Sequence, residues 1–402
     1  MSNELCARCK GRGYCGKPCR ILAKIKAFQP KIKLQFSGSS PPEIFVGRHN
    51  YPEVNTGILS PEEYGDTEKL SSAEYWYKEK ASIDDILSFR SRLIYSRFKT
   101  NIKKVRGKLI NTLQEISISS KSVLTEFQLS KKPSVSFSLS KHVPFIGNPA
   151  PLKSARLEEN PFVEKKVDYL VNDFHVKASD AINEMYKGGI ETSSIIKILS
   201  AGMIGQGTRR KLVPTRWSIT AVDDTLSKQL LERIRFYPEI SEILVFSNEY
   251  VGNHYEFILL PDKFSFEVIE AKMSGSVWNP AGRLKVMKDY ESFLGRKKYA
   301  ENVTGAYYSN RLALCEYLER ERRQASCLVM RECRPEYYAP LGVGILREAS
   351  RDAFMKKPEK FTSLAEAFKK IQERLRLPAE IFKNESKLLE EYGRQTRLGK
   401  WI

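Results

Sequence analysis

The amino-acid sequence predicts a mixed α+β fold with several domains, an N-terminal four-cysteine zinc knuckle and a flexible C-terminal peptide motif. Three observations lead to this class. The 402 residues are enough for two or three hydrophobic cores, and 41% of them are hydrophobic. Segments with helical and with alternating periodicity are interspersed along the chain. Four of the seven cysteines lie within the first 19 residues.

Composition and periodicity divide the chain into four regions. Residues 1–28 are small, basic and rich in cysteine, and residues 29–150 form an N-terminal α/β region. Residues 151–377 form the main α/β domain, and residues 378–402 contain a C-terminal helix and a tail. No stretch reaches 18 apolar residues, and the first residues lack the apolar segment of a secretory signal. We therefore expect an intracellular, cytoplasmic protein without a membrane segment.

The first half of the chain alternates loop-like and regular segments. Residues 37–66 carry many prolines and glycines and are expected to be loop-like. From Ser71 to about Arg106 the pattern is helical, and Ser82 is placed to cap the segment "IDDILSFRSRLIYSRF". The segment "PSVSFSLSK", residues 133–141, alternates apolar side chains with serines and predicts a half-buried strand.

The main domain is predicted to mix helices and strands. Helices are expected over 163–174, 179–189, 193–202, 363–377 and 381–392, the fourth with a capping box of Ser363 and Glu366. Strands are expected over 215–224, 242–247, 255–261, 264–270, 327–333 and 341–348. The strands over 255–261 and 264–270 are close in sequence, which favours an antiparallel meander.

The charge of the chain favours a polyanionic partner. There are 67 Lys and Arg against 48 Asp and Glu, which gives a formal net charge of +19. Such an excess attracts nucleic acids by steering and by counterion release. The alternative is a surface rich in both Lys and Glu, as in proteins from thermophiles. Charge alone does not separate DNA, RNA and phosphorylated metabolites.

The N-terminal cysteines have the spacing of a metal site. Cys6, Cys9, Cys15 and Cys19 form the pattern C-x2-C-x5-C-x3-C, among several glycines and basic residues. Four thiolates complete the tetrahedral coordination of Zn²⁺, so the predicted role is structural. An iron–sulfur cluster or four free thiols are the alternatives.

The last eight residues, "QTRLGKWI", place large apolar side chains at the free end of the chain. Gln395, Leu398, Trp401 and Ile402 fit the pattern Q-x-x-h-x-x-a-a, in which h is aliphatic and a is usually aromatic. A single 3₁₀ turn brings the side chains of Leu398, Trp401 and Ile402 to one side of the segment. The segment resembles the PIP box that docks on the sliding clamp PCNA, although Ile402 replaces the usual second aromatic. The alternative is a tail that packs on its own domain.

Two segments in the middle carry groups that bind or polarise phosphate. "FVGRHNYP" supplies Arg48 and His49 after a short strand, and the predicted strand over 215–224 supplies a second set. We assign phosphate binding to Arg48, Thr215, Arg216 and Ser218, and catalysis to His49, Asp223 and Asp224. Adjacent aspartates at the end of a strand can hold Mg²⁺ or act as general base.

Each of these residues also has a structural interpretation. Arg216 could pair with an internal carboxylate, Asp223 and Asp224 could cap a following helix, and His49 could be a turn residue. The glycine-rich segment "SAGMIGQGTRRK" precedes three cations and could cradle an anion, but it lacks the spacing of a Walker A loop. No Ser-His-Asp or HExxH signature is present, so catalysis is left open.

Longer blocks resemble those of a known family. "PPEIFVGRHNYPEVNTG", "LSAGMIGQGTRRKLVPTRWSITAVDDTLSK", "YYSNRLALCEYL" and "PLGVGILREASRDAF" look like signature blocks of the archaeal Nre proteins. Together with the two termini, the resemblance covers nearly the whole chain. It implies archaeal origin, a role in repair of DNA damage and partnership with PCNA. It implies no settled reaction.

Three classes of function remain open on these grounds. The first is a DNA-binding repair factor tethered to the clamp, and a basic groove lined with aromatic side chains would favour it. The second is a phosphohydrolase or nuclease acting on DNA or on a nucleotide-derived ligand such as an ADP-ribose phosphate. A nucleotide or divalent ion between Arg216 and Asp223 would favour that class. The third is an adaptor that only joins partners.

Overall fold

The computed structural model describes residues 33–133 and 144–392, together with Cys9 and Ala23. The chain divides into two compact units between Leu226 and Ser227, here called the N-terminal unit and the C-terminal unit. Each unit contains a six-stranded sheet packed with helices, which confirms the mixed α+β class. The zinc segment, apart from Cys9 and Ala23, and the predicted strand over 133–141, apart from Pro133, lie outside the described residues. The predicted regions 29–150 and 151–377 divide the chain elsewhere, within strand β6.

The N-terminal unit is built on the sheet β1-β5-β6-β4-β3-β2, in which β4 and β6 are parallel and the other neighbours are antiparallel. Its strands are β1 (Gln35–Ser40), β2 (Ile44–Val46), β3 (Glu53–Ser60), β4 (Ile94–Asn101), β5 (Val123–Leu129) and β6 (Asn148–Leu157). Its helices are η1 (Glu68–Leu70), α3 (Ala73–Lys78), α4 (Ile83–Ser91), α5 (Lys108–Ile118), α6 (Lys165–Asn172), α7 (Ala178–Lys187), α8 (Thr192–Ser200) and η2 (Gly207–Arg209). Helix α9 (Thr215–Ile234) begins in this unit and runs across the boundary.

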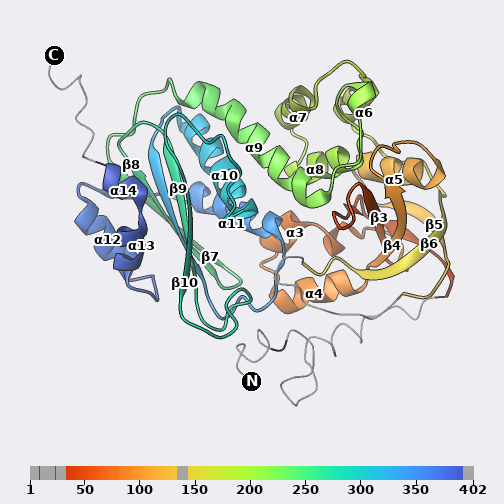
Figure 1. The fold of residues 1–402 in the computed structure, drawn as a ribbon, viewed down its shortest axis with the longest axis horizontal. Helices are drawn as coiled ribbons and strands as arrows, with labels where there is room; N and C mark the ends of the chain where they lie inside the picture. The colour runs from red at the N-terminus through yellow and green to blue at the C-terminus, as the bar shows by residue number, and fades with distance from the viewer. Residues whose placement is uncertain (1–8, 10–22, 24–32, 134–143, 393–402) are drawn as a thin grey trace. The chain divides into compact units, whose positions relative to one another are not determined.

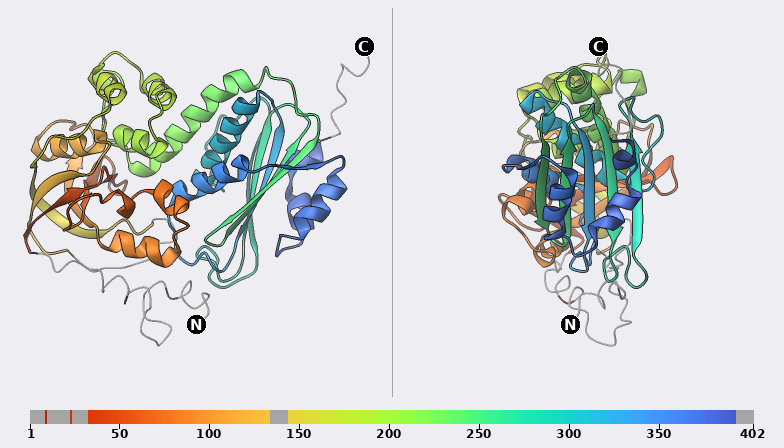
Figure 2. Two further views of the ribbon diagram at one scale, coloured as in Figure 1. Left: turned by 180° about the vertical axis from the view of Figure 1, so that it is seen from behind. Right: turned by 90° about the vertical axis from the view of Figure 1, so that its left-hand side faces the viewer.

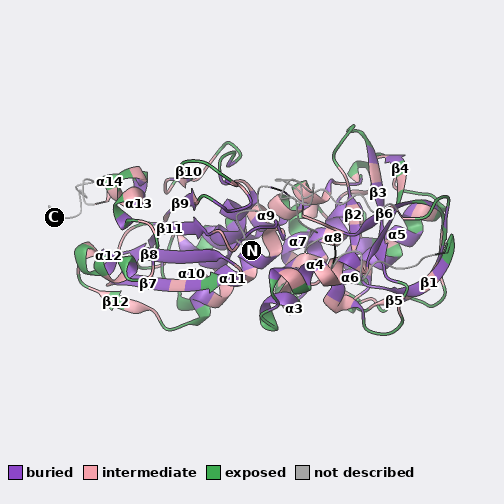
Figure 3. Cartoon of the chain, turned by 90° about the horizontal axis from the view of Figure 1, so that it is seen from below, coloured by how far each residue is buried: buried purple, intermediate pink, exposed green. Residues whose placement is uncertain are grey.

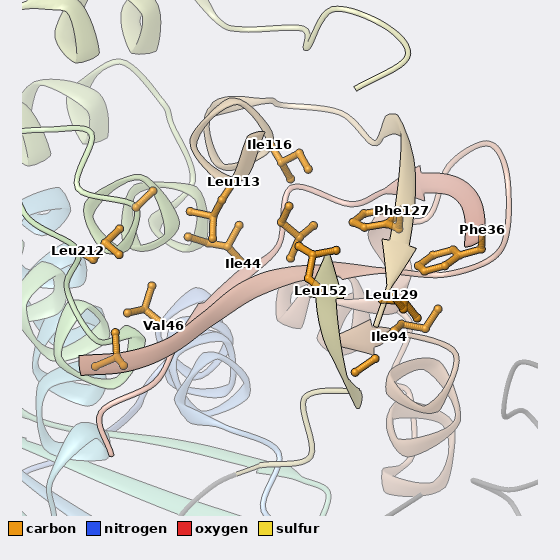
Figure 4. Close-up of a cluster of buried hydrophobic side chains, with 14 of the residues drawn as sticks. Phe36, Ile44, Val46, Ile94, Leu113, Ile116, Phe127, Leu129, Leu152 and Leu212 are labelled. Carbon is orange, nitrogen blue, oxygen red and sulfur yellow. The ribbon is translucent and has the colours of Figure 1, made fainter. Parts of the chain in front are cut away.

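Two apolar clusters hold the N-terminal sheet between helices. On one face, Leu113 and Ile116 of α5 pack against side chains from all six strands, including Phe127 of β5 (Figure 4). Leu212, from the segment before α9, belongs to the same cluster. On the other face, a smaller cluster around Tyr95 and Leu70 includes Phe89 of α4. The larger cluster matters for function because it anchors the segments that meet near the start of α9.

The C-terminal unit is built on the sheet β10-β9-β11-β8-β7-β12. Its strands are β7 (Ile243–Tyr250), β8 (Asn253–Leu260), β9 (Ser265–Lys272), β10 (Lys285–Glu291), β11 (Ser326–Cys333) and β12 (Glu359–Phe361). Its helices are α10 (Gly305–Glu321), α11 (Val343–Met355), α12 (Leu364–Gln372), α13 (Ala379–Glu385) and α14 (Lys387–Glu391). No helix in the described part of the chain combines the length and the apolar composition needed to span a bilayer.

Helices cover both faces of the C-terminal sheet. Figure 1 and the left view of Figure 2 show α10 and α11 on one side and α12, α13 and α14 on the other. Phe368, Ile371 and Phe382 of the second group pack against Ile258 and Met330 of the sheet. Every residue of β8 and of β11 is buried, as the purple colour of these strands in Figure 3 shows. The sheet is therefore the centre of a three-layer unit.

The predicted helix from Ser71 to about Arg106 is wrong in its extent. Ser82 does cap α4, and Asp85 completes a capping box. The helix ends at Ser91, however, and Ile94–Asn101 form strand β4 between β3 and β6. Here strand pairing decides the conformation, because Ile94 and Phe98 face the core while Arg97 and Lys99 stay exposed.

The predicted strand over residues 215–224 is also wrong, because Thr215 begins the 20-residue helix α9. Ser218, Val222 and Leu226 recur at helical spacing, and all three are buried. The buried face of this helix also includes polar side chains, which hides its amphipathic pattern. The strand predicted over 341–348 is a helix as well, since α11 begins at Val343 after Gly342, whose φ is 102°.

Residues 37–66, predicted to be loop-like, contain β2, β3 and most of β1, so that prediction is wrong. The other differences concern pairing and helix ends. Strands β8 and β9 do not form a meander, because β11 lies between them, parallel to β9 and antiparallel to β8. Ser363 caps α12 as predicted, but the Glu366 side chain bonds to the Thr362 hydroxyl rather than closing the capping box. The predicted helix over 381–392 is two helices, since Ser386 ends α13 and caps α14.

Candidate nucleic-acid interface

The start of α9 is fixed to the β2–β3 turn and to the end of α8. The backbone N–H of Val46 in β2 donates to Thr215 Oγ1 at 2.9 Å, and the hydroxyls of Thr215 and Ser200 lie 3.0 Å apart. Ser200 Oγ also donates to the carbonyl of Val213 at 2.7 Å. Figure 1 shows the start of α9 beside α8. The predicted phosphate-binding segments around Arg48 and Arg216 are thus brought together.

A third segment, the one that follows β4, joins this group. The N–H of Ile102 donates to the carbonyl of Pro52 at 3.1 Å, and the N–H of Leu212 donates to the carbonyl of Ile102 at 2.8 Å. The rings of Tyr51 and Trp217 lie 5.1 Å apart between centroids, at 54°. These three contacts and the Val46–Thr215 hydrogen bond are the four contacts that join the β2–β3 turn, the segment after β4 and the start of α9.

Each of these three segments lies in a stretch without acidic residues. No Asp or Glu occurs over residues 44–52, 86–114 or 192–222. Eight cationic residues lie within three residues of the four contacts. Lys99 belongs to β4 itself and Arg210 donates to backbone carbonyls of its own surroundings, so we define the basic surface as the other six cations, together with Tyr51 and Trp217. The six are Arg48, Lys103, Lys104, Arg209, Lys211 and Arg216.

The six cations of the basic surface are available to a ligand. Five are exposed and Arg216 is partly exposed, and none of them has an ion pair within the described residues. Two carboxylates lie equally near in sequence. Glu43 pairs with Arg90 at 3.4 Å and Lys197 at 3.6 Å, and Glu53 accepts a hydrogen bond from the Asn101 amide. The local field is therefore positive.

Arg210 shows what a structural arginine looks like in the same segment. Its guanidinium donates to three backbone carbonyls, those of Gly205, Val171 and Asp173, at 2.7–2.8 Å. It also stacks over Phe174 at 4.5 Å, and partial burial lowers its pKa. One cation of the predicted anion cradle "SAGMIGQGTRRK" thus holds the loop together.

The glycines of that segment have a packing role. Gly202 has a φ of 70°, and a Cβ built on it would lie 2.7 Å from the carbonyl oxygen of Lys211. Only glycine permits that backbone conformation and that close approach. Gly202 therefore fixes the position of Lys211 and Leu212, and through them the contact with Ile102.

The residues with predicted catalytic roles differ in burial and in direction. Asp223 and Ser218 are fully buried on α9. Asp223 and Asp224 are consecutive in a helix, so they point about 100° apart, and Asp223 lies about 12 Å along the axis from Thr215. His49 is exposed in a turn where Asn50 has a φ of 60° and the Tyr51–Pro52 peptide is cis. Among the described residues, no group of three His, Cys, Asp or Glu is placed to hold a metal.

Sequence reasoning missed part of the basic surface. It singled out Arg48 and Arg216, but not Lys103, Lys104 or the aromatic pair. A scan for long segments without Asp or Glu would have found two of the three segments, those within 86–114 and 192–222. Three of the predicted zinc ligands and the predicted clamp-binding residues, Gln395, Leu398, Trp401 and Ile402, lie outside the described residues. Of the predicted zinc ligands only Cys9 is described, and it is buried.

The chain is similar to one family of proteins over most of its length. The family model "Archaeal Nre, N-terminal" matches residues 14–279, and "Archaeal Nre, C-terminal" matches residues 291–401. A protein named DNA repair protein NreB, from Archaeoglobus fulgidus, is 36% identical over 99% of this chain and 100% of its own length. One named DNA repair protein NreA, from Haloferax volcanii, is 38% identical over 83% of each chain. No solved structure matches the chain.

Proposed function

Because the chain belongs to the archaeal Nre family, we propose that it acts in DNA repair and that it binds DNA through the basic surface. Relatives that it matches over most of their length are named DNA repair proteins, which supports the first part. The observation that carries the second part is local. Three segments without acidic residues meet through four contacts and present six cations that have no ion pair within the described residues.

Phosphate binding by such a surface follows from its charge and not from a built pocket. Lys and Arg side chains neutralise backbone phosphates and release condensed counterions, which gives affinity without sequence preference. If all six cations of the basic surface contact phosphate, the logarithm of the affinity for duplex DNA should fall with the logarithm of salt concentration with a slope of about −5. A fluorescence anisotropy titration between about 50 and 200 mM salt measures this slope. A slope near zero would contradict DNA binding by this surface.

We further propose that the tail over Gln395–Ile402 binds a PCNA sliding clamp. The support is the spacing of Gln395, Leu398, Trp401 and Ile402, which matches the PIP-box pattern. Leu398, Trp401 and Ile402 would each gain about 1.5–3 kcal/mol on entering an apolar groove. Ordering the segment offsets part of that gain.

We also propose that Cys6, Cys9, Cys15 and Cys19 bind one structural Zn²⁺. Their spacing supports the proposal, since four thiolates within 14 residues can complete a tetrahedral shell. Elemental analysis of the purified protein should give one zinc per chain, and Cys9→Ser should lower that content. A protein that lacks zinc, iron and any other metal, with Cys9→Ser equally stable, would refute the site.

Nothing in the described part of the chain favours the phosphohydrolase or nuclease alternative. That alternative was based on a predicted strand over 215–224, with Arg216 near its start and the Asp223–Asp224 pair at its end. On the helix, Asp223 lies about 10 Å along the axis from Arg216 and is fully buried. The contacts of the basic surface therefore support a binding role better than the positions of Asp223 and Asp224 support catalysis.

A further inference from the structure

We infer that the basic surface takes unpaired DNA, with a nucleobase stacked on the Tyr51–Trp217 pair. This inference rests on the proposed DNA-binding function and specifies its ligand. It starts from the aromatic pair, because Tyr51 is 45% exposed and Trp217 is 44% exposed. Among the described residues, no other ring pair has both members exposed to this extent. A half-exposed Trp forgoes burial that a partner could provide.

The two rings are held in place by the fold rather than by each other. Trp217 is the third residue of α9, next to Ser218, which is fully buried. Tyr51 precedes Pro52, whose carbonyl accepts the hydrogen bond from Ile102. Both backbones are therefore fixed by the contacts that also bring the cations together. A ligand would meet rings that need little further ordering, which favours binding.

Other exposed aromatic side chains of the N-terminal unit differ in their surroundings. Lys121 lies over the ring of Phe162, and Arg210 lies over that of Phe174. The tyrosines Tyr64 and Tyr169 are exposed to 71% and 67%, but neither forms a ring pair. Of these exposed rings, only Tyr51 and Trp217 lie in the segments that define the basic surface, with Arg48 three residues from Tyr51 and Arg216 next to Trp217.

The combination of rings and cations selects a single strand over a duplex. In a duplex, neighbouring base pairs cover the faces of the bases, and only phosphates and base edges are accessible. In an unpaired strand, each base has a free face that can stack on an aromatic side chain, while cations follow the phosphates. Cations alone would serve both forms, so the exposed ring pair is what distinguishes them.

The first test compares three oligonucleotides of equal length on the full chain, by fluorescence anisotropy at one salt concentration. They are a single strand, a blunt duplex and a single strand with abasic sites throughout. The single strand should bind more tightly than the other two. Affinity for the duplex or for the abasic strand that equals that for the intact strand would overturn the inference.

The second test removes the rings one at a time. Stacking contributes about 1–3 kcal/mol for each base, so Trp217→Ala should weaken single-strand binding about 5- to 150-fold. Tyr51→Ala should also weaken it, and Trp217→Phe should restore much of the loss. Tyr64→Ala is the control, since it removes an exposed ring of the same unit that belongs to no ring pair, and it should change nothing. Equal effects of Trp217→Ala and Tyr64→Ala would contradict stacking.

A spectroscopic readout separates stacking from general loss of binding. A base stacked on Trp217 should quench its fluorescence on titration with single-stranded DNA, and this quenching should be absent in Trp217→Phe. Quenching that is the same in both proteins would overturn the assignment. An RNA strand of the same sequence that binds more tightly than DNA would overturn the choice of DNA.

The outcomes also separate this inference from the proposed function. If duplex and single strand bind equally and the salt dependence is steep, the DNA-binding proposal stands and the stacking inference is wrong. If neither binds, the DNA-binding proposal is wrong as well. Steep salt dependence together with preference for the intact single strand supports both.

Discussion

The two units of the molecule use their cationic side chains in opposite ways. In the C-terminal unit, buried arginines are paired with buried carboxylates. Arg311 contacts Glu291 at 2.9 Å, Arg334 contacts Glu332 at 2.8 Å, and Arg331 pairs with Glu270. In the N-terminal unit, the six cations of the basic surface have no ion pair within the described residues. The buried arginines of the C-terminal unit stabilise its interior, and the cations of the basic surface are accessible to a partner.

This difference shows why the net charge of +19 does not locate a binding surface by itself. A buried arginine adds to the count, but its carboxylate partner cancels its field and the interior hides it. Arg331 illustrates this, since it is almost fully buried between Glu270 and Asn253. The pairing of each cation, and not the total, indicates where a polyanion can bind.

The largest effect should come from the C-terminal tail. If the buried arginines of the C-terminal unit are paired with carboxylates of the same unit, they are not available to a partner. Clamp binding should then depend on the tail alone. Truncation after Gly393 should abolish binding to the cognate PCNA, as measured by calorimetry. A micromolar complex needs about −8 kcal/mol, and the truncation removes Leu398, Trp401 and Ile402, whose burial supplies most of that free energy. The melting temperature should stay unchanged. Clamp affinity that survives truncation would refute the tail, and a large drop in melting temperature would show that the tail belongs to the fold.

The next effect concerns the buried pairs. Arg331→Met leaves Glu270 buried without its arginine, which should lower the free energy of unfolding by about 3–5 kcal/mol. Lys103→Gln, on the basic surface, should change it by less than about 0.5 kcal/mol. Urea unfolding followed by circular dichroism measures both. Similar losses in the two variants would remove the distinction between structural and available cations.

Cysteine reactivity sharpens the comparison in a second way. Cys315, Cys327 and Cys333 of the C-terminal unit are buried, and burial raises the pKa of each thiol, that of Cys333 to about 11. These thiols are therefore protonated at pH 8 and should not react with Ellman's reagent until urea unfolds the chain. Mass spectrometry can locate any modified cysteine. Rapid modification of Cys327 in the folded protein would contradict the buried core.

The class of fold and most element positions were accessible from the sequence, because hydrophobic periodicity is a local property. The strands over 242–247, 255–261, 264–270 and 327–333 all occur in the structure. The order of these strands in the sheet did not follow from hydrophobic periodicity. Strand β11 enters between β8 and β9, and that choice depends on contacts between residues more than 50 positions apart. Closeness in sequence was a misleading guide here.

The prediction of a strand where α9 lies failed for a different reason. Its buried face carries Ser218, Asp223 and Ser227, so the apolar signal of a helix is weak. The alternation of Trp217, Ile219 and Ala221 then imitated a strand. The candidate site was affected in turn, because Asp223 and Asp224 moved from the end of a strand into a helix. Lys103 and Lys104 joined the site through the contact of Ile102 with Leu212, 110 residues away, which no local pattern reports.

The central claim is that the unpaired cations of the basic surface, and not the total charge, bind DNA. The most direct test compares two double variants with the wild-type protein, Lys103→Gln with Lys104→Gln and Lys131→Gln with Lys132→Gln. Both remove two adjacent exposed lysines from the same unit. The slope of log affinity against log salt, measured with single-stranded DNA, should become less steep by about 1.4 in the first variant. It should stay at the wild-type value in the second. Equal changes in both would contradict the claim, since they would mean that DNA responds to the overall charge.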